Sequence, residues 1–173
     1  AVAELQLYVE QRALADGDSV GTVGILQVPN GSINVVPGRC LFSLDLRAPS
    51  DAQRDAMARD VLAQLQTLCD RRGVHYTLTE TMRASAAPSA PAWQQRWEDA
   101  LTALGVPLYR LPSGAGHDAM KLHEMLPQAM LFVRGQNSGI SHNPLESTTS
   151  DDMQLAVDAF GQLVNTLALQ ATH

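Results

Sequence analysis

The polar loop 138–144 contains a histidine, His142, beside glycine, serine and asparagine residues. It follows the apolar segment 129–133 and precedes a helical pattern that begins at Ser150. Loops at the ends of buried strands are where α/β proteins place ligands, and neutral imidazole is a common ligand of transition metals. The loop alone leaves two interpretations open: His142 binds a metal ion, or it is a solvent-exposed or helix-capping histidine.

The glycine-rich segment 113–118, Ser-Gly-Ala-Gly-His-Asp, is a second candidate site. It follows a predicted strand and opens a predicted helix, so its backbone N–H groups could bind a carboxylate or another anion. The candidate binding residues of this segment are Gly114, Ala115, Gly116 and His117. The sequence matches neither a phosphate-binding loop nor a dinucleotide-binding motif. The other interpretation is a plain turn in which Asp118 complements the helix dipole.

Arg47 and Asn34 are candidates for binding a carboxylate. Arg47 ends the polar face of the alternating segment 39–47, and Asn34 precedes a Pro-Gly turn. A guanidinium is a planar fork that matches a carboxylate, and an amide adds a directional donor. Taken by itself, Arg47 is better explained as a surface ion-pair partner near Asp45.

The chain has few partners to complete a catalytic site around these residues. Its other histidines stand singly, and it has no His-x-Asp, His-Glu-x-x-His or paired-glutamate motif. Glu146 could support His142, although a solvated carboxylate is the simpler interpretation. Cys40 and Cys69 have no basic motif beside them, which favours buried free thiols over nucleophiles or a disulfide. We therefore expect that this chain cannot hold a closed catalytic metal site by itself.

The first group of secondary-structure elements that would position these residues lies in residues 1–83. Their patterns predict, in order, a helix, two strands, a helix and a strand: 1–14, 20–28, 39–47, 50–72 and 74–82. This is most of a ferredoxin-like split β-α-β-β-α-β sandwich, an α+β fold, without its first strand. Such a sheet would have an unpaired edge.

Local signals mark the ends of both predicted helices. The first has Val2, Leu5, Val9 and Leu14 on one side but no capping residue, so we expect that residue 1 is not the natural beginning of the protein. The second begins with a capping-box pattern, Ser50 and Gln53, and stops at Gly73.

The second half of the chain has a different pattern. Residues 84–91 contain only Ala, Ser and Pro, which predicts a linker. Residues 92–173 then alternate between helix and strand patterns, at 92–104, 107–111, 117–125, 129–133 and 150–169. These are too few strands for a separate sheet, so we expect the C-terminal segment of a larger α/β catalytic domain. The predicted domains are therefore 1–83 and 92–173, joined by the linker 84–91.

Composition excludes several classes of function. The chain has 173 residues, 45% of them hydrophobic, and a net charge of −6, which suits one globular domain or two small ones. Its 12 basic residues form no stripe, which argues against binding to nucleic acid. No run of about 18 apolar residues predicts a membrane span. Two cysteines and no secretion signal favour a cytoplasmic protein.

Five segments together resemble a known family. Residues 22–24, 29–38 and 42–47 resemble the lid and dimerisation domain of the metal-dependent amidohydrolases that include allantoate amidohydrolase, N-carbamoyl-L-amino-acid hydrolase, ureidoglycolate amidohydrolase and β-ureidopropionase. Residues 113–119 and 139–144 are similar to the two C-terminal signatures of that family, in the same order. The catalytic domain of the family is metallopeptidase-like.

The resemblance implies a centre of two divalent ions, Mn²⁺ or Zn²⁺, that hydrolyses a carbamoyl or ureido C–N bond. It implies that His142 is the last metal ligand, and that residues 114–117 line the substrate pocket. It also implies that Asn34 and Arg47 hold the substrate carboxylate, partly across a homodimer interface formed by the lids. The family's other ligands, its glutamate base and its oxyanion-binding histidine have no counterpart in this chain, so we expect them upstream of Ala1.

We therefore expect the C-terminal part of a cytoplasmic, homodimeric amidohydrolase whose catalytic base lies outside this sequence. The predicted reaction is hydrolysis of allantoate, in purine catabolism, to ureidoglycine or ureidoglycolate, ammonia and CO₂. Hydrolysis of an N-carbamoyl-L-amino acid or of ureidoglycolate is the alternative, because these substrates also carry a carboxylate and a ureido or carbamoyl group. A hypothesis of a different class is that the isolated chain is a non-catalytic dimerisation and substrate-gripping fragment.

Overall fold

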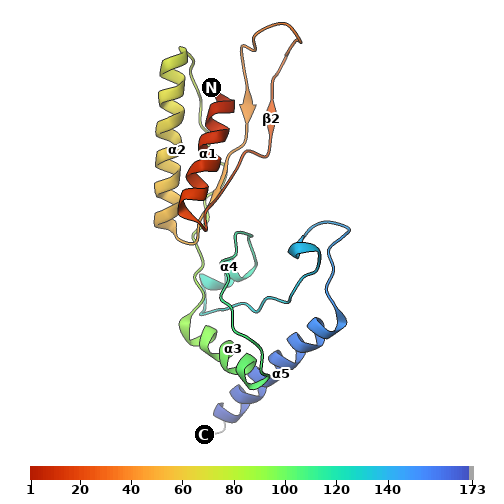
Figure 1. Ribbon diagram of the computed structural model, residues 1–173. Helices are drawn as coiled ribbons and strands as arrows, with labels where there is room; N and C mark the ends of the chain where they lie inside the picture. The colour runs from red at the N-terminus through yellow and green to blue at the C-terminus, as the bar shows by residue number, and fades with distance from the viewer. Residues whose placement is uncertain (172–173) are drawn as a thin grey trace. The chain divides into compact units, whose positions relative to one another are not determined.

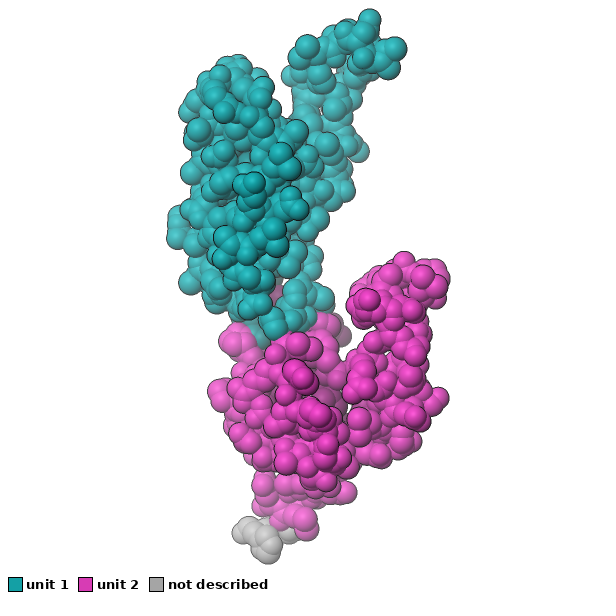
Figure 2. All heavy atoms as spheres, viewed as in Figure 1, with its two compact units in different colours: residues 1–87, 112–116 teal, residues 88–111, 117–173 magenta. Residues whose placement is uncertain are grey.

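A computed structural model describes residues 1–171 of the chain (Figure 1). These residues divide into two compact units (Figure 2). Unit 1 contains residues 1–87 and the glycine-rich segment 112–116, and unit 2 contains residues 88–111 and the chain from His117 onward. The glycine-rich segment thus belongs to the unit formed by the N-terminal half of the chain.

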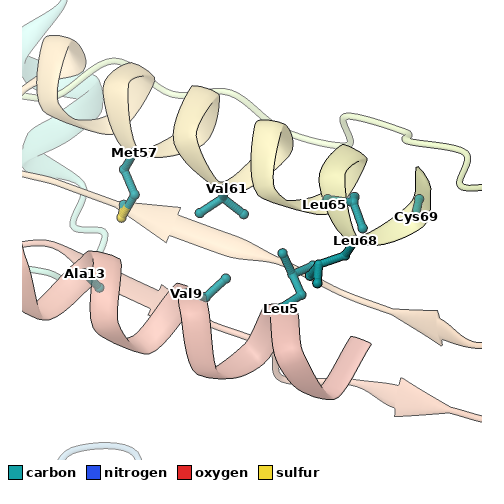
Figure 3. Packing of buried hydrophobic residues seen from close by; sticks show 8 residues of the cluster. All are labelled: Leu5, Val9, Ala13, Met57, Val61, Leu65, Leu68 and Cys69. Atoms are coloured by element: carbon teal, nitrogen blue, oxygen red, sulfur yellow. The ribbon is translucent and has the colours of Figure 1, made fainter. Parts of the chain in front are cut away.

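The core of unit 1 lies between helices α1 (Val2–Asp16) and α2 (Asp51–Arg72), whose apolar side chains point toward one another (Figure 3). Its buried residues recur at helical spacing: Leu5, Val9, Ala13, Met57, Val61, Leu65, Leu68 and Cys69. The prediction that Leu14 joins this face is wrong. Leu14 is 73% exposed, because the stripe from Leu5 through Val9 continues four residues on to Ala13. Cys69 and the half-buried Cys40 are free thiols, as predicted.

The ends of α2 confirm the signals in the sequence. The Ser50 hydroxyl accepts the backbone N–H of Gln53 at 3.3 Å and donates to the side-chain Oε1 of Gln53 at 2.9 Å. Gly73 ends the helix at φ 61°, a left-handed conformation that glycine adopts without steric cost. By contrast, α1 begins at Ala1 without a side-chain cap, as expected.

The sheet of unit 1 is a long antiparallel hairpin made of two short ladders. Its strands are β1 (Val20–Thr22), β2 (Leu26–Gln27), β3 (Leu41–Phe42) and β4 (Asp45–Arg47). Thr22 faces Asp45 in the first ladder, and Leu26 faces Phe42 in the second. Between these two pairs, one side of the hairpin advances four residues, from Thr22 to Leu26, and the other side advances three, from Phe42 to Asp45. Residues 23–25 therefore contain a bulge.

The predicted strand at 74–82 is wrong, because these residues form no hydrogen-bonded ladder. Their alternating apolar residues Val74, Tyr76 and Leu78 are all exposed. A strand requires a neighbour whose backbone accepts and donates its hydrogen bonds, and residues 1–171 provide none for this segment. The fold therefore mixes helices with a sheet, while the ferredoxin-like topology stays a prediction.

Unit 2 is built around helices α3 (Pro91–Ala103) and α5 (Ser150–Ala171). Both confirm predicted helices, and Pro91 occupies the first turn of α3, where its missing N–H has no cost. The rings of Trp97 and Phe160 approach to 6.1 Å between centroids, which joins the two helices.

The connections of unit 2 differ from the prediction. The helix expected at 117–125 is confined to α4 (Ala119–His123), and a 3₁₀ turn, η1, spans Asn137–Gly139. The strands predicted at 107–111 and 129–133 are wrong, since neither pairs with a strand in the described chain. Among residues 1–171, no helix has the length and apolar character needed to cross a membrane.

Gly21 lies where β1 crosses α1, and we predict that this position tolerates no side chain. A Cβ at Gly21 would lie 2.6 Å from Cγ1 of the buried Val9. Gly21→Ala should therefore lower the free energy of unfolding by about 1–3 kcal/mol, measured by urea denaturation. Gly38→Ala is the matched control, because nothing lies within 4 Å of its Cβ position. An equal effect of the two substitutions would contradict this packing.

Candidate functional site

A pocket of about 490 Å³ opens on unit 1 between the base of the hairpin and the glycine-rich segment. The residues that line it are Val20, Thr22, Gly24, Ser43, Asp45, Arg47, Gly114 and Ala115. Register explains why they meet. Val20 pairs with Arg47 and Thr22 pairs with Asp45, and cross-strand partners share a face of the sheet.

The opposite face of the same hairpin packs against the core. Phe42, Leu44 and Leu46 lie against the buried residues of α1 and α2. The alternation predicted from the sequence for residues 39–47 is therefore confirmed: its apolar residues pack, and its polar residues line the pocket.

Arg47 is held by two neighbours inside the pocket. Its Nε and Nη2 donate to the two carboxylate oxygens of Asp45 at 2.9 and 2.8 Å, and its Nη1 donates to the backbone oxygen of Gly114 at 3.0 Å. The ion pair near Asp45 is thus confirmed, and the contact with Gly114 is additional. The hydrogen bonds and charge of Arg47 lower the pKa of Asp45, and Asp45 raises the pKa of Arg47, so both stay charged at neutral pH.

The remaining donors of Arg47 are available to a ligand. A guanidinium carries five N–H groups, and three of them serve Asp45 and Gly114. One N–H on Nη1 and one on Nη2 have no acceptor in the described part of the chain. Two such donors match the two oxygens of a carboxylate. With half of the Arg47 side chain exposed, a small anion can reach them.

The glycine-rich segment contributes to the pocket through its turn and not through a helix terminus. Helix α4 begins at Ala119, and the backbone N–H of Ala115 already donates to the Ser113 hydroxyl at 3.2 Å. Gly114 and Ala115 therefore do not lie at a helix start, and their role in binding an anion stays a prediction. Gly114 contributes its carbonyl oxygen, which accepts from Arg47.

The other two candidates of this segment do not line the pocket. Gly116 belongs to unit 1 but is not one of the pocket residues. His117 belongs to unit 2, where its ring and that of Phe132 form a T-shaped contact at 6.0 Å between centroids. Roles of Gly116 and His117 in binding stay predictions.

Asn34 lies in the turn at the tip of the hairpin, between the bridged residues Ser32 and Val35. A bridge between Ser32 and Val35 closes this turn, and Oδ1 of Asn34 accepts the Ser32 hydroxyl at 3.1 Å. Asn34 and Arg47 are thirteen positions apart, and the ladder of Leu26–Gln27 with Leu41–Phe42 lies between them, so their separation along the hairpin is on the order of 40 Å. The two side chains of one chain therefore do not meet at one ligand.

His142 lies in unit 2, in an exposed loop with a left-handed backbone at φ 56°. Its backbone N–H donates to Oε2 of Glu146 at 2.8 Å, and its Nδ1 lies 3.2 Å from the Ser141 hydroxyl. Glu146 thus holds the backbone of His142 and not its imidazole. A left-handed conformation is uncommon for a residue with a side chain, and the Glu146 contact stabilises it.

The described residues do not by themselves fit a dinuclear metal centre. Nowhere in residues 1–171 do three or more His, Cys, Asp or Glu side chains gather in a group that could hold a metal ion. His142 is a single imidazole, and Glu146 is engaged with the backbone. We therefore derive no chemical step through a metal from these residues.

Thr22 and Ser43 are pocket residues that the sequence interpretation missed. The Ser43 hydroxyl accepts the backbone N–H of Ile25 at 3.0 Å, which ties the bulge to the opposite strand. The alternation that singled out Arg47 also places Ser43 on the polar face, and antiparallel pairing brings Thr22 beside Asp45. The alternation in the sequence therefore marked Ser43 as a candidate, whereas Thr22 could be found only from the register of the two strands.

Comparison with known proteins identifies relatives of the whole described fold. The N-carbamoyl-L-amino acid amidohydrolase of Geobacillus stearothermophilus is 35% identical over 168 residues, covering 97% of this chain and 41% of the relative. The allantoate amidohydrolase of Bacillus subtilis is 30% identical over 152 residues, covering 85% and 35%. The crystal structure of an amidase of the hydantoinase/carbamoylase family from Burkholderia multivorans matches with a TM-score of 0.87 and 29% identity, covering 94% of this chain and 39% of that one.

The chain spans 35–41% of the length of these relatives. A family model, described as peptidase family M20/M25/M40, matches residues 3–166. That range includes the hairpin, the glycine-rich segment and the loop that carries His142. The chain belongs to peptidase family M20/M25/M40.

Proposed function

We propose that this chain is part of a metal-dependent amidohydrolase that cleaves the C–N bond of a ureido or carbamoyl acid, with Arg47 binding the substrate carboxylate. The observation that carries the proposal is the pocket in which Asp45 and Gly114 hold Arg47 and leave two N–H groups for a ligand. Relatives named for N-carbamoyl-L-amino acids and for allantoate support it, because both substrates carry a carboxylate.

The residues of this chain bind and orient the substrate in this proposal. Arg47 fixes the carboxylate, and Gly114 and Ala115 line the pocket beside it. By resemblance to the family, the proposal also gives Gly116 and His117 a role in substrate binding. Holding the carboxylate contributes binding energy at a part of the substrate that does not react, so its effect appears in KM. His142 would supply one imidazole to a centre of two divalent ions, Mn²⁺ or Zn²⁺, which needs more ligands than the described residues bring together.

Allantoate remains the leading substrate, and an N-carbamoyl-L-amino acid is the alternative. The relative that acts on N-carbamoyl-L-amino acids favours the alternative, since it is 35% identical over 97% of the chain. With allantoate as its substrate, the enzyme would act in purine catabolism in the cytoplasm. The hypothesis of a different class, a non-catalytic dimerisation and substrate-gripping fragment, applies to the isolated chain.

Release of ammonia tests the proposed activity. The protein encoded by the complete reading frame that contains this chain is assayed with allantoate, ureidoglycolate and several N-carbamoyl-L-amino acids. At least one of them should release ammonia, a chelator should abolish the release, and Mn²⁺ or Zn²⁺ should restore it. Absence of release from all of these substrates with either metal would contradict the proposal.

The hairpin tip of a second copy supplies Asn34 to the site in this proposal. Within one chain, Asn34 and Arg47 are too far apart to share a ligand. The tip also exposes apolar side chains, Ile33, Val35 and Val36, with Ile33 and Val36 almost completely accessible. A homodimer formed through the hairpin domain would cover these side chains and bring Asn34 to the Arg47 of the other protomer.

Mixing two variants that bind the substrate weakly tests this arrangement, and at a substrate concentration far below their KM we predict recovery of activity. Arg47→Ala and Asn34→Ala proteins are mixed under conditions that exchange subunits. Each heterodimer then has one site with both substitutions and one site with neither, so random exchange should restore about a quarter of the wild-type activity. If Asn34 and Arg47 of the same chain shared a site, every site would carry one substitution and no activity would return.

A further inference from the structure

We infer that Asp45 is a positioning residue that fixes the guanidinium of Arg47 in the orientation in which it binds the substrate carboxylate. The inference rests on the proposed function of Arg47. It adds a residue whose carboxylate does not touch the substrate and acts through Arg47.

The contacts of Arg47 are those of a held group. Asp45 accepts from Nε and Nη2 at 2.9 and 2.8 Å, a side-on bidentate contact that fixes the plane of the guanidinium. Gly114 accepts from Nη1 at 3.0 Å and comes from a segment far along the chain. Contacts from two separate elements leave the long arginine side chain little freedom to rotate.

The placement of Asp45 follows from the strand. Residues two apart in a strand project from the same face, so Asp45 and Arg47 both stand on the pocket side of β4. Asp45 also pairs with Thr22 across the hairpin, which fixes its position in the strand.

A structural role does not explain the pair equally well. Half of each side chain is exposed to solvent, and ion pairs with that exposure contribute little to stability. An aspartate beside a pocket for a carboxylate also repels the ligand. That repulsion is offset because the ion pair with Arg47 neutralises the charge of the aspartate. The same ion pair fixes the direction of the remaining N–H groups of Arg47.

Steady-state kinetics of the protein from the complete reading frame, with its best substrate, tests the inference. Asp45→Asn keeps the shape of the side chain but sets an amide N–H against the donors of Arg47, so KM should rise about tenfold while kcat stays within about twofold. Asp45→Glu should recover part of the loss. The double variant Asp45→Asn/Arg47→Ala should have the KM of Arg47→Ala alone, since Asp45 acts through Arg47.

The control is Asp60→Asn, which breaks the ion pair of Asp60 with Arg12 on α1, away from the pocket, and should leave KM unchanged. Independent, multiplying effects of Asp45→Asn and Arg47→Ala would overturn the inference. So would a wild-type KM in Asp45→Asn when Arg47→Ala raises KM. A wild-type KM in Arg47→Ala overturns the proposed role of Arg47 as well, which separates the two failures.

Discussion

Replacing His142 by alanine is expected to lower the rate of ammonia release by at least about 100-fold and to reduce the bound metal. In the proposed enzyme this imidazole is a metal ligand, so its removal opens the coordination sphere. The fold should survive, because the contact of Glu146 with position 142 uses the backbone N–H and not the ring. Metal content by elemental analysis and initial rates of ammonia release measure the two effects together.

His123→Ala is the matched control for this substitution. His123 also belongs to unit 2, at the end of the short helix α4, and the proposal gives it no role. It should keep the metal content and rate of the wild type. A His142→Ala protein with unchanged metal content and unchanged rate would remove His142 from the metal centre.

Replacing Arg47 by alanine should raise KM for a carboxylate substrate by about 100-fold and change kcat little. Hydrogen bonds between charged groups contribute about 1.5–3 kcal/mol each, and 1.4 kcal/mol corresponds to a factor of ten in affinity. The effect falls on KM because Arg47 holds a part of the substrate that does not react. Arg47→Lys should recover only part of the affinity, since an ammonium lacks the planar fork.

Arg59→Ala is the control for charge, because Arg59 is an exposed arginine of α2 that does not line the pocket. It should leave both kinetic constants near their wild-type values. A large fall in kcat with an unchanged KM in Arg47→Ala would show that Arg47 acts on the reaction and not on binding.

Local signals in the sequence predicted the helices well. The Ser50 hydroxyl caps the start of α2, and Gly73 ends the helix in a left-handed conformation. Both ends were predictable, because a helix end is decided by residues within one turn of it. The error at Leu14 has the same origin: near a helix end, the pattern alone did not distinguish Ala13 from its larger neighbour.

Strands were predicted less well, because pairing is not a local property. Three segments have strand-like compositions but no pairing partner in residues 1–171: 74–82, 107–111 and 129–133. Within the described residues, only the hairpin, whose two sides are close in the sequence, forms ladders. A segment with high strand propensity therefore forms a strand only when a pairing partner is present.

The candidate site divides in the same way. The pair of Asp45 and Arg47 was predictable, since residues two apart in a strand share a face. The contact of Arg47 with Gly114 was not, because it joins residues 67 positions apart. The bulge at residues 23–25, which shapes one wall of the pocket, also required the register of the two ladders.

If Arg47 binds the substrate carboxylate, a substrate with that carboxylate and its uncharged carboxamide must differ in kcat/KM. The kcat/KM of the protein from the complete reading frame is compared for an N-carbamoyl-L-amino acid and for the carboxamide of the same compound, which lacks only the negative charge. The acid should be preferred by about 100-fold, because only the acid can accept both free N–H groups of Arg47 as a charged partner. Equal values for the acid and the carboxamide would contradict it.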